Sequence, residues 1–215
     1  MSEPRPYLHE PFTGPALDSR LRWHEEPPRW SLRAGDREGR LRIEAAAGTD
    51  FWRKTHYGFE ADNGHFLFAE VAGDLVLTTH VRFEPVHQYD QAGLMVRVSP
   101  TCWLKTSVEY EPDGPSRLGA VVTRHGYSDW STQAFPSEAR AVALRVRRED
   151  ADCIVEASID GDGRDWVQIR MAHLDDAGPD TAVGCGLYAC SPKDAGFVAE
   201  FSHLTIELGR LRTEP

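Results

Sequence analysis

Short runs of alternating apolar and polar residues, separated by turn residues, constrain this chain more than any other feature of its sequence. In one such run, apolar or small residues occupy every second position from Leu75 to Phe83. Because side chains of a β-strand point alternately to its two faces, this spacing predicts a strand with one buried face. Helical spacing is nearly absent, so the sequence predicts an all-β fold.

Strands are predicted wherever such a run is bounded by Gly, Pro, Asp or Asn. The predicted strands cover residues 29–33, 40–45, 51–55, 65–70, 74–83, 91–98, 103–110, 117–124, 130–134, 140–147, 153–160, 165–170, 183–189 and 197–207. Turns are expected at 62–64, 112–115 and 160–163, and a helical turn within 171–181. The number of these short strands is larger than a small immunoglobulin-type sandwich holds, and an antiparallel two-sheet jelly roll accommodates them better.

Composition indicates one domain and excludes two classes of partner. No linker interrupts the chain, so we expect one jelly-roll domain over residues 12–208, with tails at 1–11 and 209–215. The 24 basic and 34 acidic residues give a formal net charge of −10, without a long basic cluster. This argues against binding to nucleic acid or to an anionic membrane surface. No run approaches the roughly 18 apolar residues of a membrane span.

The cysteines, histidines and N-terminus bear on compartment and cofactors. The N-terminal residues are polar and proline-rich and lack the apolar region of a secretory signal. The four cysteines, Cys102, Cys153, Cys185 and Cys190, match no zinc spacing, and the nine histidines are scattered. Neither a glycine-rich phosphate loop nor a serine-hydrolase motif occurs. We therefore expect a cytoplasmic protein with no metal and no other cofactor.

The run from Tyr89 to Tyr110 contains the most informative surface. Its two predicted strands place apolar residues on one face. The other face carries Gln91, Gly93, Arg97, Trp103, Lys105, Ser107 and Glu109. An aromatic, two bases, an amide and an acid are residue types that bind polar ligands.

The pairing of these two strands can be predicted from the loop between them. A loop with an odd number of residues would place Arg97 opposite Lys105, and Gly93 opposite Glu109. In that register all the polar residues share one face, whereas a shift by one residue would scatter them. We therefore expect one contiguous polar patch.

Several short motifs resemble those of a known family. They are Asp50-Phe51-Trp52-Arg53, Tyr57-Gly58-Phe59, the run from Tyr89 to Arg97, Trp103-Leu104-Lys105, Val108-Glu109-Tyr110, Val121-Val122-Thr123 and Ser128-Asp129-Trp130-Ser131. In these motifs the chain resembles, over roughly residues 12–208, the domain family that includes the fungal "regulation of enolase" protein. The resemblance implies a concanavalin A-like lectin/glucanase jelly roll and no established enzymatic activity.

The polar patch is the first candidate site, with carbohydrate as its expected ligand. A Trp ring offers an apolar platform, and charged or amide groups offer hydrogen bonds to hydroxyls. The residues expected to bind the ligand are Trp52, Asp90, Gln91, Arg97, Trp103, Lys105, Glu109, Asp129 and Trp130. The alternative is a solvated sheet face held by ion pairs. Phe51, Phe59, Phe66 and Phe68 are expected in the core.

Glu109 and Glu111 provide an alternative, enzymatic interpretation. They share a strand face, and residues two apart on a strand lie roughly 6.6 Å apart. Retaining glycosidases hold two carboxyl groups about 5–5.5 Å apart. Pro112 interrupts strand pairing after Glu111, however, and Tyr110 stands where the glucanase motif has an acid. We therefore favour binding over catalysis.

The sequence thus predicts a lectin-like domain that binds a sugar or sugar phosphate on its concave sheet face. Two other classes of function stay open. One is a glycoside-processing enzyme that uses Glu109 and Glu111. The other is an interaction module whose partner is a metabolic enzyme or a second copy of the chain.

Overall fold

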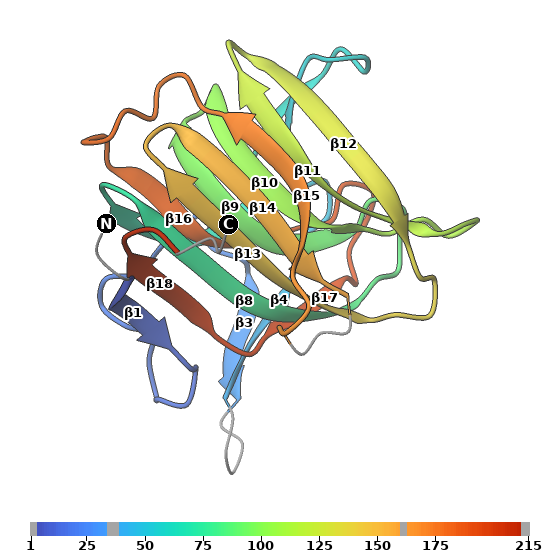
Figure 1. The fold of residues 1–215 in the computed structure, drawn as a ribbon. Helices are drawn as coiled ribbons and strands as arrows, with labels where there is room; N and C mark the ends of the chain where they lie inside the picture. Colours follow the sequence, from blue (N-terminus) through green and yellow to red (C-terminus); the bar gives the residue numbers. More distant parts are fainter. Residues whose placement is uncertain (1–3, 34–38, 160–162, 212–215) are drawn as a thin grey trace.

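Two antiparallel sheets stacked face to face form the body of the protein (Figure 1). The structure is a computed structural model that describes residues 4–33, 39–159 and 163–211. Within those ranges every regular element is a strand, and none contains a helix that could span a membrane. The predicted all-β sandwich is confirmed, and its architecture is consistent with a jelly roll. Most of the turn expected at 160–163 lies outside the described residues.

One sheet has nine strands. In order across the sheet these are β15 (Val167–His173), β14 (Asp152–Ser158), β13 (Ala141–Glu149), β8 (Leu75–Glu84), β17 (Val198–Phe201), β4 (Arg40–Glu44) and β3 (Arg29–Arg33), while β18 (Leu204–Leu208) also pairs with β8, and β1 (Arg5–Glu10) pairs with β18. The long strand β8 therefore has β13 on one side and both β17 and β18 on the other.

The second sheet has seven strands, and a separate hairpin lies outside it. Its order is β12 (Tyr127–Phe135), β11 (Ser116–Arg124), β10 (Cys102–Glu109), β9 (Gln91–Ser99), β16 (Val183–Cys190), β7 (His65–Val71) and β2 (Arg22–His24). The hairpin consists of β5 (Phe51–Arg53) and β6 (Glu60–Asp62). Four consecutive strands, β9 to β12, form a meander that positions the candidate site.

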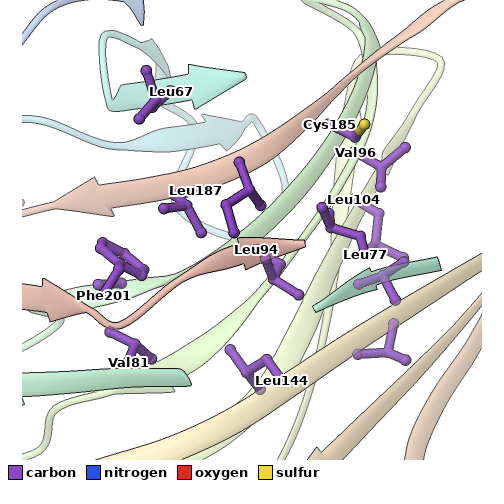
Figure 2. Packing of buried hydrophobic residues seen from close by; sticks show 14 of the residues in the cluster. Leu67, Leu77, Val81, Leu94, Val96, Leu104, Leu144, Cys185, Leu187 and Phe201 are labelled. Atoms are coloured by element: carbon purple, nitrogen blue, oxygen red, sulfur yellow. The ribbon is translucent and has the colours of Figure 1, made fainter. Parts of the chain in front are cut away.

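The main core fills the space between the two sheets. Figure 2 shows Leu94 of β9, Leu187 of β16 and Leu144 of β13 meeting there from opposite sheets, and all three are fully buried. Burying one such side chain contributes about 1.5–3 kcal/mol to stability. The alternation predicted from the sequence therefore supplies the inner faces of both sheets.

A second, smaller core lies on the outer face of the seven-stranded sheet. It contains Phe51, Trp52, Phe66, Met95, Trp103, Val121, Tyr188 and Cys190. Phe51 and Trp52 come from β5, whereas the other members come from the sheet. The β5–β6 hairpin therefore covers part of a sheet face that sequence patterning alone would leave open to solvent.

The register of β9 and β10 differs from the prediction by two residues. Arg97 pairs with Trp103, Lys105 with Met95, and Glu109 with Gln91. The cause is a short turn between Ser99 and Cys102 followed by an irregularity at Cys102–Trp103. Because side chains alternate with period two, a shift by two residues changes the partners and keeps every residue on its face.

At the position of Gly93, strands β9 and β10 have no room for a larger residue. It pairs with Ser107 and not with Glu109, so it leaves no hollow beside that carboxylate. A Cβ atom added to Gly93 would lie 2.0 Å from the carbonyl oxygen of Thr106. Close backbone approach, and not ligand access, explains this glycine.

Two further expectations are corrected. Within the expected tail 1–11, Arg5–Glu10 forms β1 at the edge of the nine-stranded sheet. Its prolines suggested a tail, but an edge strand tolerates Pro6, and the register shifts beside that residue. The segment 171–181 contains no helical turn, because after β15 it forms two separate turns.

Candidate ligand-binding pocket

A pocket of about 680 Å³ lies between the outer face of the seven-stranded sheet and the β5–β6 hairpin. Gln91, Lys105 and Glu109 reach it from β9 and β10, and Trp130 reaches it from β12. The hairpin and its flanking residues supply the opposite side. The second core described above packs beside the pocket and fixes the distance between hairpin and sheet.

Lys105 is held rigidly at the base of the pocket. Its side chain is 2% exposed, and Nζ donates to Gln91 Oε1 at 2.8 Å and to Asp50 Oδ1 at 3.1 Å. Tyr188 also donates to Gln91 Oε1, at 3.1 Å. Burial opposes the charge on Lys105, yet its pKa is raised above the usual value because Asp50 and Glu109 stabilise the ammonium.

Glu109 is the most perturbed acid of the pocket. It is 7% exposed, and burial raises the pKa of its carboxyl group to about 7. Lys105 opposes this shift, whereas the negative charges of Asp50 and Glu111 add to it. Among the described residues, the Glu109 carboxylate has no hydrogen-bond or ion-pair partner, although it lines the pocket. A buried acid without a partner that faces a cavity is suited to a ligand that donates hydrogen bonds.

Aromatic side chains form the walls of the pocket. They are Trp52, Tyr57, Phe59, Tyr89 and Trp130. Tyr57 is 50% exposed and packs edge-on against Trp52 with ring centroids 5.5 Å apart. Nζ of Lys193 lies 5.4 Å from the centroid of the Tyr89 ring. The walls therefore combine firmly packed rings with rings whose faces are open to solvent.

A double hydrogen bond attaches the hairpin to the sheet. Arg97 of β9 donates to both carboxylate oxygens of Asp62 on β6, at 2.7 and 2.8 Å. Arg53 of β5 forms ion pairs with Asp62 and Glu60. A bidentate arginine–carboxylate pair fixes orientation as well as distance, so it holds the hairpin above the sheet.

Comparisons with known proteins identify the family. Residues 23–208 match the family described as "Protein of unknown function (DUF1349)". The chain belongs to the DUF1349 family. It is 36% identical over 174 residues to "Regulation of enolase protein 1" of Saccharomyces cerevisiae strain ATCC 204508 / S288c, a match that covers 80% of this chain and 84% of the relative. The resemblance expected from the motifs is thereby confirmed.

Solved structures agree with this assignment. The crystal structure of a functionally unknown protein from Saccharomyces cerevisiae superposes with a TM-score of 0.79 at 33% identity, covering 89% of this chain and 98% of that one. The GH43 protein BlXynB from Bacillus licheniformis superposes with a TM-score of 0.71 at 19% identity, covering 92% of this chain and 38% of that one. At that identity the second match shows a common fold for the DUF1349 chain and nothing more.

The structure brings five of the nine predicted ligand residues of this DUF1349 domain into one pocket. These are Trp52, Gln91, Lys105, Glu109 and Trp130. They come from three segments that are far apart in the sequence. The patch predicted from β9 and β10 thus contributes only its acid, amide and lysine.

Trp103 was expected to form a stacking platform for the ligand, but in the structure it is a core residue. It is fully buried, and its ring packs edge-on against Phe51 with centroids 6.1 Å apart. It lies on the predicted face, but the β5–β6 hairpin covers it. Arg97 is likewise committed to Asp62 and does not line the pocket.

Asp90 and Asp129 also lie outside the pocket. Asp90 is buried, and its carboxylate accepts hydrogen bonds from the backbone N–H groups of Val86 and His87 and from the Ser191 hydroxyl. It stabilises the loop before β9. Asp129 forms a 2.9 Å ion pair with Arg170 of the other sheet. Both were predicted to bind ligand, and neither faces the cavity.

The proposed carboxylate pair is not assembled in the pocket. Glu109 lines the cavity, whereas Glu111 follows the end of β10 and accepts a hydrogen bond from Gln88 Nε2 at 2.9 Å. Of the acids in the pocket, Asp50 is the one whose charge acts on both Glu109 and Lys105.

Several pocket residues were missed from the sequence. Asp50, Tyr57 and Asn63 line the cavity, and Phe59, expected in the core, does so while 44% exposed. Asp50, Tyr57 and Phe59 belong to motifs that carry the family resemblance, which was the available signal. Within the described ranges, no group of three His, Cys, Asp or Glu side chains is placed to hold a metal ion.

Proposed function

We propose that the pocket binds a neutral carbohydrate and that its role is recognition without bond cleavage. The observation that carries this proposal is Glu109, a buried acid that faces the cavity without a partner. A carboxyl group in that position accepts a hydrogen bond from a ligand hydroxyl, or donates one when protonated. Either hydrogen bond gives the ligand a partner that no described side chain of the protein already occupies.

The size and walls of the pocket support the same ligand class. Ligand sites commonly enclose about 300–1,000 Å³, and 680 Å³ accommodates one or two sugar rings. Tyr57 and Phe59 are exposed and Trp130 is half-buried, and all three line the pocket, where the apolar face of a sugar can pack on aromatic rings. Lys105 and Gln91 are preorganised by their mutual hydrogen bond, so binding orders few additional side chains.

Charge distinguishes a neutral sugar from a sugar phosphate. Four carboxylates, those of Asp50, Glu60, Asp62 and Glu109, line the pocket, against the two ammonium groups of Lys105 and Lys193. Asp62 and Glu60 are neutralised by Arg97 and Arg53, and the buried Lys105 is already paired with Asp50. A phosphate dianion would therefore meet no unpaired buried cation among the lining residues that the structure describes. Of the two ligand classes predicted from the sequence, the neutral one is therefore the better fit.

A matched pair of substitutions tests the proposal. Monosaccharides and short oligosaccharides are screened by thermal shift, and binders are measured by isothermal titration calorimetry. Glu109→Gln is expected to weaken binding about tenfold, because a hydrogen bond to a charged group contributes about 1.5–3 kcal/mol. Glu111→Gln makes the same chemical change two residues away, outside the pocket, and is expected to leave affinity unchanged. Equal affinity in wild type and Glu109→Gln would refute the proposed site.

Catalysis is a second candidate because of one observation, the raised pKa of Glu109. A carboxyl group with a pKa of about 7 is suited to general acid–base chemistry near neutral pH. The test is the hydrolysis of aryl glycosides. Activity in wild type that is lost in Glu109→Gln and retained in Glu111→Gln would favour catalysis over recognition alone.

A protein partner is the remaining candidate, and the exposed rim of the pocket favours it. Tyr57, Phe59 and Tyr127 are 44–60% exposed around the hairpin, and exposed aromatic residues are enriched in protein interfaces. The name of the yeast relative suggests enolase as a first partner to test. The test is a pulldown of enolase by this protein, with and without a sugar that binds the pocket. Loss of enolase in the presence of the sugar would indicate that both bind the same surface.

A further inference from the structure

A second hollow, of about 770 Å³, lies on the outer face of the nine-stranded sheet, on the opposite side of the sandwich from the pocket. The register places Arg145, Thr78, Thr205 and His9 in one row across β13, β8, β18 and β1. Adjacent strands lie about 4.8 Å apart, so Arg145 and His9 are separated by roughly 14 Å at the backbone. Thr78 and Thr205 lie between them in this row, and Ala143 lies next to Arg145 on the same face of β13, so the side chains in this part of the face are short.

The ionisable side chains that line this hollow are all basic. Its lining includes Arg40, Arg82, Arg145, His9, His80 and His203, and no carboxylate belongs to the lining among the residues that the structure describes. Glu200 is the cross-strand neighbour of Arg82, and Glu156 pairs with Arg145, but neither lines the hollow. A chain with a net charge of −10 thus gathers three arginines and three histidines in one concavity.

Arg82 has no committed partner. It is exposed on β8, and no hydrogen bond or ion pair to its side chain is found in the described ranges. Arg145 differs, because Nε donates to Glu156 at 2.7 Å and its guanidinium carbon lies 4.3 Å from the centroid of the Trp166 ring. Arg145 therefore fixes the Trp166 wall, whereas Arg82 keeps its donors available to a ligand.

His203 contributes hydrogen bonding and not charge. Burial, together with the neighbouring His9 and His80, lowers the pKa of its imidazole to about 4. Its Nδ1 lies 2.9 Å from the Ser202 hydroxyl, and its carbonyl accepts a hydrogen bond from Thr79. The ring is therefore neutral at pH 7 and fixed in place, while the arginines supply the positive charge.

We propose that this hollow binds a small organic oxyanion, with its anionic group against Arg82 and its organic part along Trp166 and Ala143. The planar guanidinium fork of arginine matches both phosphate and carboxylate groups. The aromatic wall gives an apolar surface for the rest of the ligand. The site is separate from the carbohydrate pocket, so the two proposals stand or fall independently.

Titration of the isotope-labelled full chain with phenyl phosphate and, separately, with benzoate tests the proposal by ¹⁵N–¹H NMR. We expect saturable shifts at the amides of Thr78, Ser202 and His203. The dissociation constants of the two anions are then compared. Tighter binding of phenyl phosphate would indicate a phosphate ligand, and tighter binding of benzoate a carboxylate ligand. Failure of both to produce saturable shifts there would overturn the proposal.

Two arginine variants show whether the effect is specific. Arg82→Gln is expected to weaken binding of the better anion about tenfold. Arg117→Gln removes a similarly exposed arginine from the seven-stranded sheet, outside both cavities, and is expected to change nothing. Equal losses in the two variants would indicate nonspecific attraction and refute the site. An unchanged amide spectrum elsewhere confirms that each variant is folded.

Discussion

The two outer faces of the sandwich arise from the same kind of strand alternation and end as different surfaces. On the seven-stranded sheet, the β5–β6 hairpin covers the face, and Lys105 and Glu109 are nearly inaccessible beside an aromatic core. On the nine-stranded sheet the face stays open, and Arg82 and His9 are exposed. Alternation thus determines which residues share a face. Whether that face is buried depends on a segment elsewhere in the chain.

Burial changes what a charged residue can do. Under the hairpin, Lys105 has fixed partners and Glu109 has a strongly raised pKa, so the pocket is preorganised for one arrangement of ligand groups. On the open face, water screens the arginines and their side chains can adjust to a ligand. We therefore expect the first site to be selective in shape and the second to be selective mainly in charge.

The largest expected effect tests whether the second core stabilises the fold. Trp103→Ala empties a fully buried site and is expected to lower the free energy of unfolding by about 3–5 kcal/mol. Trp166→Ala, on the open face, is expected to cost about 1 kcal/mol or less, because that ring is half-buried. Urea unfolding of both variants measures the difference. Similar losses would show that the hairpin adds no core of its own.

The next effect is a pH dependence caused by Glu109. Its pKa is about 7 in the folded protein and near 4.5 when unfolded, so the folded state binds the proton more tightly. Stability therefore falls as pH rises from about 4.5 to about 7, by at most about 3 kcal/mol, and then levels off. Glu109→Gln is expected to stabilise the protein by up to that amount at pH 8 and to have little effect at pH 4.

Glu111→Gln is the comparison for this pH dependence. It removes only the smallest of the named causes that raise the pKa of Glu109, so most of the pH dependence is expected to remain. Denaturant unfolding between pH 4 and pH 8 gives the comparison. If Glu109→Gln and wild type lose stability in parallel across this range, the Glu109 carboxyl group does not have a raised pKa.

The smallest effect concerns the attachment of the hairpin. Asp62→Asn replaces the charge-assisted pair with Arg97 by a weaker hydrogen bond and is expected to cost about 1–2 kcal/mol. It should also speed hydrogen exchange at the amides of β5 and β6. Asp129→Asn breaks a pair whose acid is 63% exposed, and a change below about 0.5 kcal/mol is expected. Unaltered exchange in Asp62→Asn would mean that the aromatic core alone holds the hairpin.

The sequence predicted the faces of β9 and β10 correctly and their partners wrongly. Alternation is a property of each strand, so the shared face of Gln91, Lys105 and Glu109 could be read directly. The register depends on the turn after Ser99 and on the irregularity between Cys102 and Trp103. Ser99-Pro100 is typical of a β-turn, but it does not reveal the irregularity that follows and so does not fix the register. A two-residue shift leaves the polar pattern unchanged, so the pattern could not reveal the error.

The candidate site was predictable only in part, because it is built by segments distant in the sequence. Trp103 and Lys105 occupy neighbouring positions on one face, yet the first became core and the second reached the pocket. The position of the hairpin decides this, and it depends on the pair between Asp62 and Arg97 across 35 residues. Strand periodicity contains no information about such a contact.

The pairing of β8 has a consequence for how the chain folds during synthesis. All the neighbours of β8 in its sheet, namely β13, β17 and β18, follow it in the sequence, and the last ends at Leu208. During translation, β8 therefore has both edges unpaired for some 60 residues and one edge incomplete for about 60 more. Exposed strand edges promote association between chains. Ribosome-bound chains that end before β17 should accordingly be the species most dependent on chaperones.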